Sequence, residues 1–289
     1  MVIKFILDSS RFVPAPGLRS RFIAFGKFLL FAVLFFALLR FAGWASGFVR
    51  VSGVGWQALI GNLGVALAAI VATAILARFE RRDFGIYGLG GRAKGWNAGA
   101  GVAAGLILLT ALLLAIRLVS SFRFGTLSSG QWIQYGTLYA ALFAAVALAE
   151  ETLWRGYALV QLSQSISFWP AAVVLSVIFG VTHLNHAEEN VSGIVFACIF
   201  GMVLAWSFRE TGSLWFAMGI HAGWDYAQSF IYGVPDSGVV LPGALLRPQV
   251  GGPKWLTGGS AGPEASMLML LVFVALVYTV RRFKRVTTF

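Results

Sequence analysis

The chain contains few charged residues and a single cysteine. Of its 289 residues, 11% are charged and 58% are hydrophobic, whereas about 25% of the residues of an ordinary soluble domain are charged. This composition excludes a water-soluble globule, because a solvated surface needs ionisable groups to cover it. The lone cysteine, Cys198, excludes a disulfide framework and a cage of cysteine thiolates around a metal ion. We therefore expect the chain to fold in a lipid bilayer.

Basic residues outnumber acidic residues, with 22 Lys and Arg against 11 Asp and Glu and a net charge of +11. Their positions argue against nucleic acid as a partner, because they lie at the ends of apolar runs, where they suit anionic lipid headgroups. When the N-terminus is placed inside, most of the basic residues fall on the inner side of the membrane. We predict that both termini are cytoplasmic.

Apolar runs of about 20 residues, each long enough to cross about 30 Å of hydrocarbon, recur along the chain. We predict about eight spans, at residues 22–43, 55–77, 95–117, 132–155, 168–185, 191–208, 213–232 and 265–280. The fold class is therefore all-α, a polytopic transmembrane helical bundle and a multi-pass integral membrane protein. We divide it into an N-terminal segment with helices one to three, residues 1–126, and a core with helices four to eight, residues 127–289.

One connection, residues 233–264, is long and rich in proline and in Gly-Gly pairs. These residues exclude a regular helix. Two interpretations stay open for this segment: a flexible loop outside the membrane, or a lid or re-entrant piece over a cavity.

Ionisable residues inside the predicted spans are candidates for function, because a charge at mid-bilayer costs several kcal/mol. The first group is Glu150-Glu151-Thr152-Leu153-Trp154-Arg155. Glu151 and Arg155 are four residues apart, so they share a helix face and can form an ion pair. Glu150 points about 100° away on a helix of 3.6 residues per turn. One carboxylate can then be structural while the other does chemistry; the alternative is a solvated helix end.

The second group is Phe179-Gly180-Val181-Thr182-His183, followed by His186. Phe179 lies one turn before His183 and can fix its imidazole by packing, while Gly180 lets another helix approach closely. By itself His183 would be read as a hydrogen-bonded core residue. His183 and His186 have the spacing of a metal-binding pair, but His186 borders a polar loop, where we expect it to face water.

The third group is His221-Ala222-Gly223-Trp224-Asp225. His221 and Asp225 share a helix face, which suits two ligands of one metal or an imidazole oriented by its carboxylate partner. Together with Glu150 and His183 they supply the ligand types that zinc or an activated water requires.

Three motifs in this order resemble those of a known family. They are the EExxxR pattern ending at Arg155, the FxxxH pattern ending at His183 and the HxxxN-like pair of His221 and Asp225. The family is the CAAX protease and bacteriocin-processing (CPBP) family of intramembrane proteases, also called type II CAAX prenyl endopeptidases. The resemblance covers about residues 127–280. It implies a bacterial inner-membrane protease that cleaves a membrane-associated peptide or a prenylated or otherwise lipidated protein.

The resemblance also implies residue roles. Glu150 would be the general base, His183 would help to hold the water or a metal, and His221 with Asp225 would bind metal or stabilise an oxyanion. Zn²⁺ is the expected metal, with Glu150, His183, His221 and Asp225 as its ligands, although a Glu–His pair can also activate water without zinc. Glu151, Arg155 and Phe179 would be supporting residues.

One departure from the family concerns Asp225, where members usually carry Asn. An ionised Asp cannot donate a hydrogen bond to an oxyanion, so Asp225 favours a ligand role or an orienting role toward His221. Two other functions stay open. An inactive family member would act as a membrane scaffold or immunity protein. A proton-coupled transporter would also bury ionisable residues, but the paired Gly/Pro-broken spans expected of one are missing from the sequence.

Overall fold

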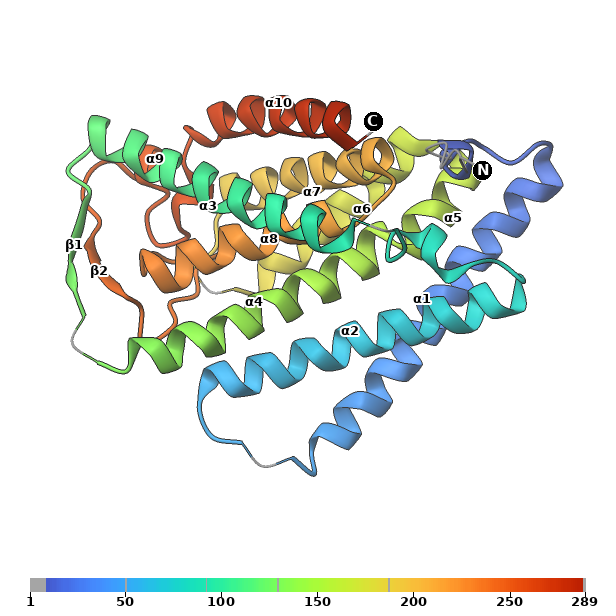
Figure 1. Ribbon diagram of the computed structural model, residues 1–289, viewed down its shortest axis with the longest axis horizontal. Coiled ribbons are helices and arrows are strands. Elements are labelled where there is room, and N and C mark those ends of the chain that lie inside the picture. The colour runs from blue at the N-terminus through green and yellow to red at the C-terminus, as the bar shows by residue number, and fades with distance from the viewer. Residues whose placement is uncertain (1–8, 50, 92, 129, 187, 288–289) are drawn as a thin grey trace.

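Helices dominate the computed structural model, which describes residues 9–49, 51–91, 93–128, 130–186 and 188–287 (Figure 1). The elements in chain order are η1 (Ser9–Phe12), α1 (Leu18–Ser46), α2 (Val54–Phe79), η2 (Phe84–Tyr87), α3 (Lys94–Val119), β1 (Arg123–Leu127), α4 (Trp132–Arg155), α5 (Tyr157–Ile166), α6 (Phe168–Thr182), η3 (His183–Asn185), α7 (Val191–Thr211), α8 (Trp215–Asp225), the π-helical turn η4 (Tyr226–Ile231), β2 (Leu246–Gln249), α9 (Lys254–Thr257), η5 (Pro263–Ala265) and α10 (Met269–Thr287). The predicted helical fold class is confirmed.

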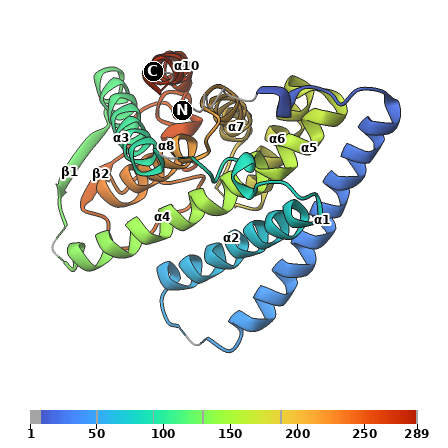
Figure 2. The same cartoon turned by 45° about the vertical axis from the view of Figure 1, so that its right-hand side comes forward.

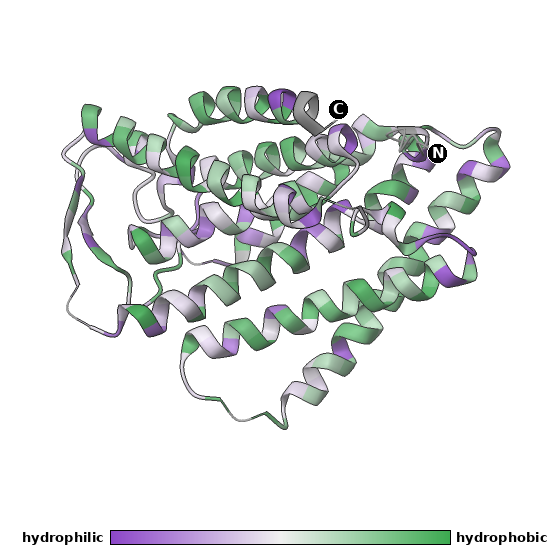
Figure 3. Cartoon of the chain, in the orientation of Figure 1, coloured by the Kyte–Doolittle hydropathy of each residue, from purple (hydrophilic) through white to green (hydrophobic). Residues whose placement is uncertain are grey.

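Five helices of the described residues are long and apolar enough to cross a membrane: α1, α2, α3, the joined pair α4 and α5, and α7. The chain is thus a multi-pass membrane protein, and Figure 3 shows apolar residues covering these helices while hydrophilic ones gather near helix ends and loops. The prediction of about eight spans is not confirmed. Helix α6 has 15 residues and α8 has 11 residues, which is short for a span, and the last turns of α10 are basic. The predicted cytoplasmic termini concern residues 1–8 and 288–289, which lie outside the described residues.

Helix α4 has the bounds predicted for the fourth span, but the helical path does not stop there. At Gly156 the backbone leaves helical geometry, with φ −75° and ψ −120°, and α5 then continues from Tyr157. The sequence between Glu150 and Arg155 therefore lies inside a span of 35 residues, Trp132–Ile166, and not at a helix end in water.

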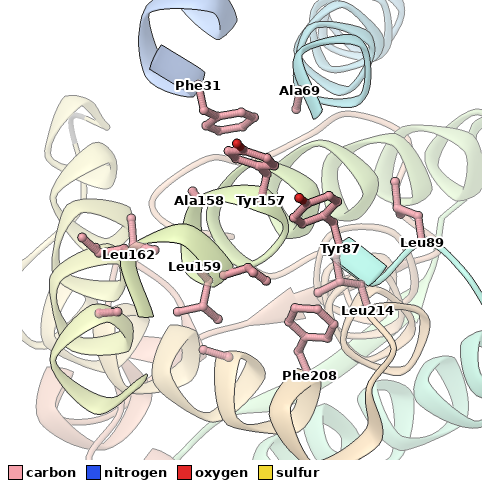
Figure 4. Packing of buried hydrophobic residues seen from close by; sticks show 14 of the residues in the cluster. Phe31, Ala69, Tyr87, Leu89, Tyr157, Ala158, Leu159, Leu162, Phe208 and Leu214 are labelled. Carbon is pink, nitrogen blue, oxygen red and sulfur yellow. The ribbon is translucent and has the colours of Figure 1, made fainter. Parts of the chain in front are cut away.

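The start of α5 is fixed by an aromatic cluster that joins it to α1, α2 and η2 (Figure 4). The Tyr157 ring lies 5.3 Å from the ring of Phe31 and 4.8 Å from that of Tyr87. Its hydroxyl donates to Glu80, whose carboxylate also pairs with Lys27 at 3.1 Å. Each buried aromatic pair contributes about 0.5–1.5 kcal/mol beyond the area that it buries. This cluster holds the bend after α4 in place.

Helices α3 and α8 touch through their backbones. A Cβ at Gly101 or Gly105 of α3 would lie 2.3 Å from a carbonyl oxygen of α8, and glycines of α8 face α3 in the same way. Such small-residue contacts let membrane helices approach closely. They fix α8, the helix that carries His221 and Asp225.

A short antiparallel ribbon of β1 and β2, absent from the sequence prediction, stands at one edge of the molecule (Figure 2). Arg123 pairs with Gln249, and Leu127 pairs with Leu246. The ribbon joins the long 233–264 connection to the α3–α4 connection, so one end of that loop is held against the bundle.

Candidate active site

A fully buried ion pair lies at the C-terminal end of α4. Arg155 Nη1 lies 3.1 Å from Glu151 Oε1, and the side chains are 2% and 0% exposed. The same Glu151 oxygen accepts a hydrogen bond from His221 Nδ1 at 3.0 Å. The Arg155 guanidinium also lies over the Phe179 ring, 4.4 Å from its centroid. The alternative of a solvated helix end is therefore wrong, because these side chains are packed between helices.

Glu150 points to a different environment, as the helix geometry predicts. Its side chain is 28% exposed, and its Oε2 lies 3.7 Å from His221 Nε2. The same nitrogen lies 3.4 Å from Asp225 Oδ2, one helical turn away on α8. His221 thus stands between carboxylates: Glu151 on the Nδ1 side, and Glu150 with Asp225 on the Nε2 side.

His183 follows α6 directly, in the turn η3. Its Nδ1 lies 3.0 Å from the Phe179 carbonyl oxygen. A carbonyl only accepts hydrogen bonds, so Nδ1 carries a proton, and Nε2 can accept a hydrogen bond when the ring carries no second proton. The Phe179 ring packs edge-on against His183 at 4.9 Å and against His221 at 6.5 Å. Phe179 therefore touches both histidines, which come from different helices.

Helix α7 closes this side of the site by close approach to α6. A Cβ at Gly180 would lie 2.3 Å from Cys198 Sγ, so only glycine fits there, as the sequence predicted. A Cβ at Gly201 would lie 2.6 Å from Arg155 Nη2. Phe200, also on α7, packs its ring 6.0 Å from that of His221.

All four predicted catalytic residues line one cavity of about 420 Å³. Glu150, His183, His221 and Asp225 share it with residues of α2, α4, α6 and α7. The structure therefore brings together side chains that are as far as 75 residues apart in the sequence, from 150 to 225.

Several residues that line this cavity were not predicted from the sequence. The long loop adds Asp236 and Glu264, which were not among the site residues predicted from the sequence. His186 was expected to face water, but it lines the cavity and donates from Nδ1 to the Ser237 carbonyl at 2.9 Å. The loop interpretation of residues 233–264 as a free extramembrane segment does not fit these contacts, because the loop forms one wall of the cavity.

The four predicted zinc ligands lie in one cavity but are not arranged as a metal centre. Within the described ranges, no group of three or more His, Cys, Asp or Glu side chains is arranged to hold a metal ion. Both His183 and His221 use Nδ1 in a hydrogen bond, which leaves one nitrogen of each for any ligand. As they stand the residues do not form such a centre, and Zn²⁺ stays a prediction.

The fold and the site together define a multi-pass membrane protein with a polar Glu–His–Asp cavity inside its helical bundle. Residues 131–227, about one third of the chain, match the family model described as Rce1-like, type II CAAX prenyl endopeptidase Rce1-like. The predicted family resemblance is confirmed over this segment, which contains every predicted site residue. No curated protein and no solved structure matches the chain.

Proposed function

We propose that the protein is an intramembrane endopeptidase that hydrolyses a membrane-associated or lipid-modified peptide, such as a prenylated protein, at the bacterial inner membrane. One observation carries the proposal: Glu150, His183, His221 and Asp225 line a single cavity within the segment that matches a prenyl endopeptidase family. The apolar part of that cavity wall, from α2, α4 and α7, suits a substrate that arrives from the bilayer.

Glu150 is the general base in this proposal. It is the partly exposed carboxylate of the Glu–Glu pair, whereas Glu151 is fully buried and held by Arg155. His183 offers Nε2 as a second acceptor in the same cavity. A water that donates one hydrogen bond to each is oriented for attack, and general-base catalysis of this kind contributes about 10²–10⁴-fold.

The bond changes follow from these positions. The water oxygen attacks the peptide carbonyl carbon while a proton passes to Glu150, which gives a tetrahedral oxyanion. The C–N bond then breaks, and Glu150 returns the proton to the leaving amine. In its imidazolium form, His221 donates from Nδ1 to Glu151 while Nε2 faces Asp225, and the positive charge of its ring stabilises the oxyanion.

Asp225 orients His221 in this scheme. It lies one turn further along α8, and its Oδ2 is 3.4 Å from His221 Nε2. We expect Asp225→Ala to lower kcat by about 10–100-fold and Asp225→Asn to lower it less, since Asn keeps an acceptor oxygen at this position. Equal loss in both variants would show that the negative charge, and not the contact, is required.

The decisive experiment is cleavage by purified protein in lipid nanodiscs. Farnesylated, quenched-fluorescent peptides serve as substrates, and Glu150→Gln is compared with wild type. We expect kcat to fall at least about 100-fold, because the base is lost while the shape is kept. Unchanged cleavage by Glu150→Gln would refute this assignment. The exposed Glu188, which lies outside the cavity wall, gives the matched control Glu188→Gln.

The same preparation separates the proposal from its alternatives. A scaffold or immunity protein keeps its biological activity when both Glu150 and His183 are substituted, whereas a protease loses it. Metal content is measured by elemental analysis beside the activity. Full activity with substoichiometric metal assigns the reaction to the Glu and His residues alone, and loss on chelation with recovery in Zn²⁺ assigns a zinc enzyme.

A further inference from the structure

The end of the cavity formed by the long loop has an acidic wall. Asp236 and Glu264 line it, and Glu150 and Asp225 line the same cavity deeper in the bundle. No lysine or arginine lines the cavity in the part of the chain that the structure describes. The only ionisable nitrogen groups among its lining residues are histidines.

No lysine or arginine of the described residues forms an ion pair with either loop carboxylate. The ion pairs among described residues leave out Asp236 and Glu264. Their hydrogen-bond donors are neutral: Ser229 Oγ donates to Asp236 Oδ2 at 3.0 Å, while Gln228 Nε2 and the Ser237 N–H donate to Glu264. A buried carboxyl group without a cation takes up a proton more readily, whereas a cation bound beside it favours the ionised form.

A fully buried amide lies beside Glu264. Gln228 is 0% exposed, and its Nε2 donates to Glu264 and to the Pro235 carbonyl. Its Oε1 has no hydrogen-bond partner among the described residues. The amide holds Glu264 from behind the cavity wall, and no cation accompanies the carboxylate there.

The acidic wall is preformed, because the loop is tied down around it. The Asp236 N–H donates to the Val239 carbonyl at 2.9 Å, and the Gly238 N–H donates to the Ala261 carbonyl at 2.7 Å. The His186 ring holds the Ser237 carbonyl from the side of η3. These bonds keep the carboxylates in place without any ligand.

We infer that the Asp236–Glu264 end of the cavity is a subsite for a basic side chain, lysine or arginine, of the substrate peptide. The inference rests on the proposed endopeptidase function and names what the substrate must carry. Val239, Leu241 and Met269 also line the cavity and offer apolar surface to the aliphatic stem of such a side chain. Its ammonium or guanidinium supplies the N–H donors and the positive charge that this wall lacks.

An organic cation fits this wall better than a metal ion. No group of three or more ligating side chains in the described residues is arranged for a metal. Lysine and arginine do not need such convergence, since each carries its own N–H donors and can bind one or two carboxylates by hydrogen bonds. Both loop carboxylates lie outside the segment that matches the family model, residues 131–227.

The test uses matched farnesylated peptides that carry Lys, norleucine or Glu at each position in turn. Cleavage is measured with the full-length protein in nanodiscs, for wild type, for the double variant Asp236→Asn/Glu264→Gln and for Glu188→Gln. We expect one position at which wild type prefers Lys over norleucine about tenfold in kcat/KM, mainly through KM. In the double variant this ratio should fall to about one, and in Glu188→Gln it should be unchanged.

A binding experiment separates the two proposals. The Kd of the same peptides is measured with Glu150→Gln protein, which does not need to cleave them. A Lys preference in Kd that the double substitution removes, without cleavage by the wild type, would support the subsite and refute the protease. Cleavage with no Lys preference at any position, or with a preference that survives the double substitution, would overturn the subsite. If the double variant does not purify as a single species, Asp236→Asn alone, which keeps an acceptor for Ser229, takes its place.

Discussion

Removing the positive charge of Arg155 while keeping its bulk should destabilise the protein strongly. Arg155→Met leaves the Glu151 carboxylate, which is 0% exposed, with His221 Nδ1 as its remaining side-chain partner. Breaking a buried ion pair on one side costs about 3–5 kcal/mol, because the other charge stays buried and loses its closest permanent counter-charge. At about 1.4 kcal/mol per tenfold, the folded-to-unfolded ratio falls by at least about 100-fold.

A double variant tests the physical reason. In Arg155→Met/Glu151→Gln both charges of this ion pair are removed together, and the glutamine oxygen still accepts from His221. The remaining loss is that of weakened hydrogen bonds, about 1–3 kcal/mol. We therefore expect the double variant to be more stable than Arg155→Met by about 2 kcal/mol.

Unfolding by SDS in mixed micelles, followed by tryptophan fluorescence, measures these differences, since the chain contains 10 Trp. The buried-charge explanation would be refuted if the double variant were less stable than Arg155→Met. It would also be refuted if Arg155→Met stayed within about 1 kcal/mol of wild type, as exposed ion pairs do.

Two further predictions concern packing and pH. Gly201→Ala should destabilise the protein by about 1–3 kcal/mol through overpacking, because a Cβ there would lie 2.6 Å from Arg155 Nη2. Gly61→Ala is the matched control, since nothing lies within 4 Å of its added Cβ. An equal decrease of the melting temperature in the two variants would contradict the packing argument. Burial raises the pKa of Asp236, and burial together with the charge of Asp236 raises the pKa of Glu264. The folded state then binds these protons more tightly than the unfolded state, so stability should fall as pH rises from the ordinary carboxyl pKa of about 4 toward the raised values. Asp236→Asn/Glu264→Gln should flatten this slope in unfolding measured between pH 4 and pH 8, and a slope of the same size in the double variant would exclude these carboxylates as its source.

Helix spacing explains why much of the site could be predicted from the sequence. Glu151 and Arg155, and likewise His221 and Asp225, are four residues apart, and each pair does meet on one helix face. The 100° step between Glu150 and Glu151 correctly separated a partly exposed carboxylate from a buried one. Local helix geometry alone fixes these relations, so they can be read without knowing any neighbour.

The span count and the loop could not be predicted in the same way. Apolar runs such as 168–185 and 213–232 resemble spans, but they form helices of 15 and 11 residues, of which α8 is buried in the bundle and α6 keeps one exposed apolar face. Their hydrophobicity is equally suited to lipid and to protein neighbours, so composition cannot separate the two. Likewise Asp236 and Glu264 follow no periodic pattern, and they reach the cavity because the β1–β2 ribbon and loop hydrogen bonds carry them there.

The sequence by itself determined that the chain folds in a bilayer, that it is helical, and which site residues pair within one helix. Composition and the 3.6-residue helical repeat are sufficient for these conclusions, because neither depends on tertiary contacts. Only the tertiary structure decided that His221 joins Glu151 of another helix at 3.0 Å, and that the loop closes an acidic wall over the cavity. These contacts join residues tens of positions apart, and they depend on glycine-mediated helix approach between α3 and α8, which no single helix encodes.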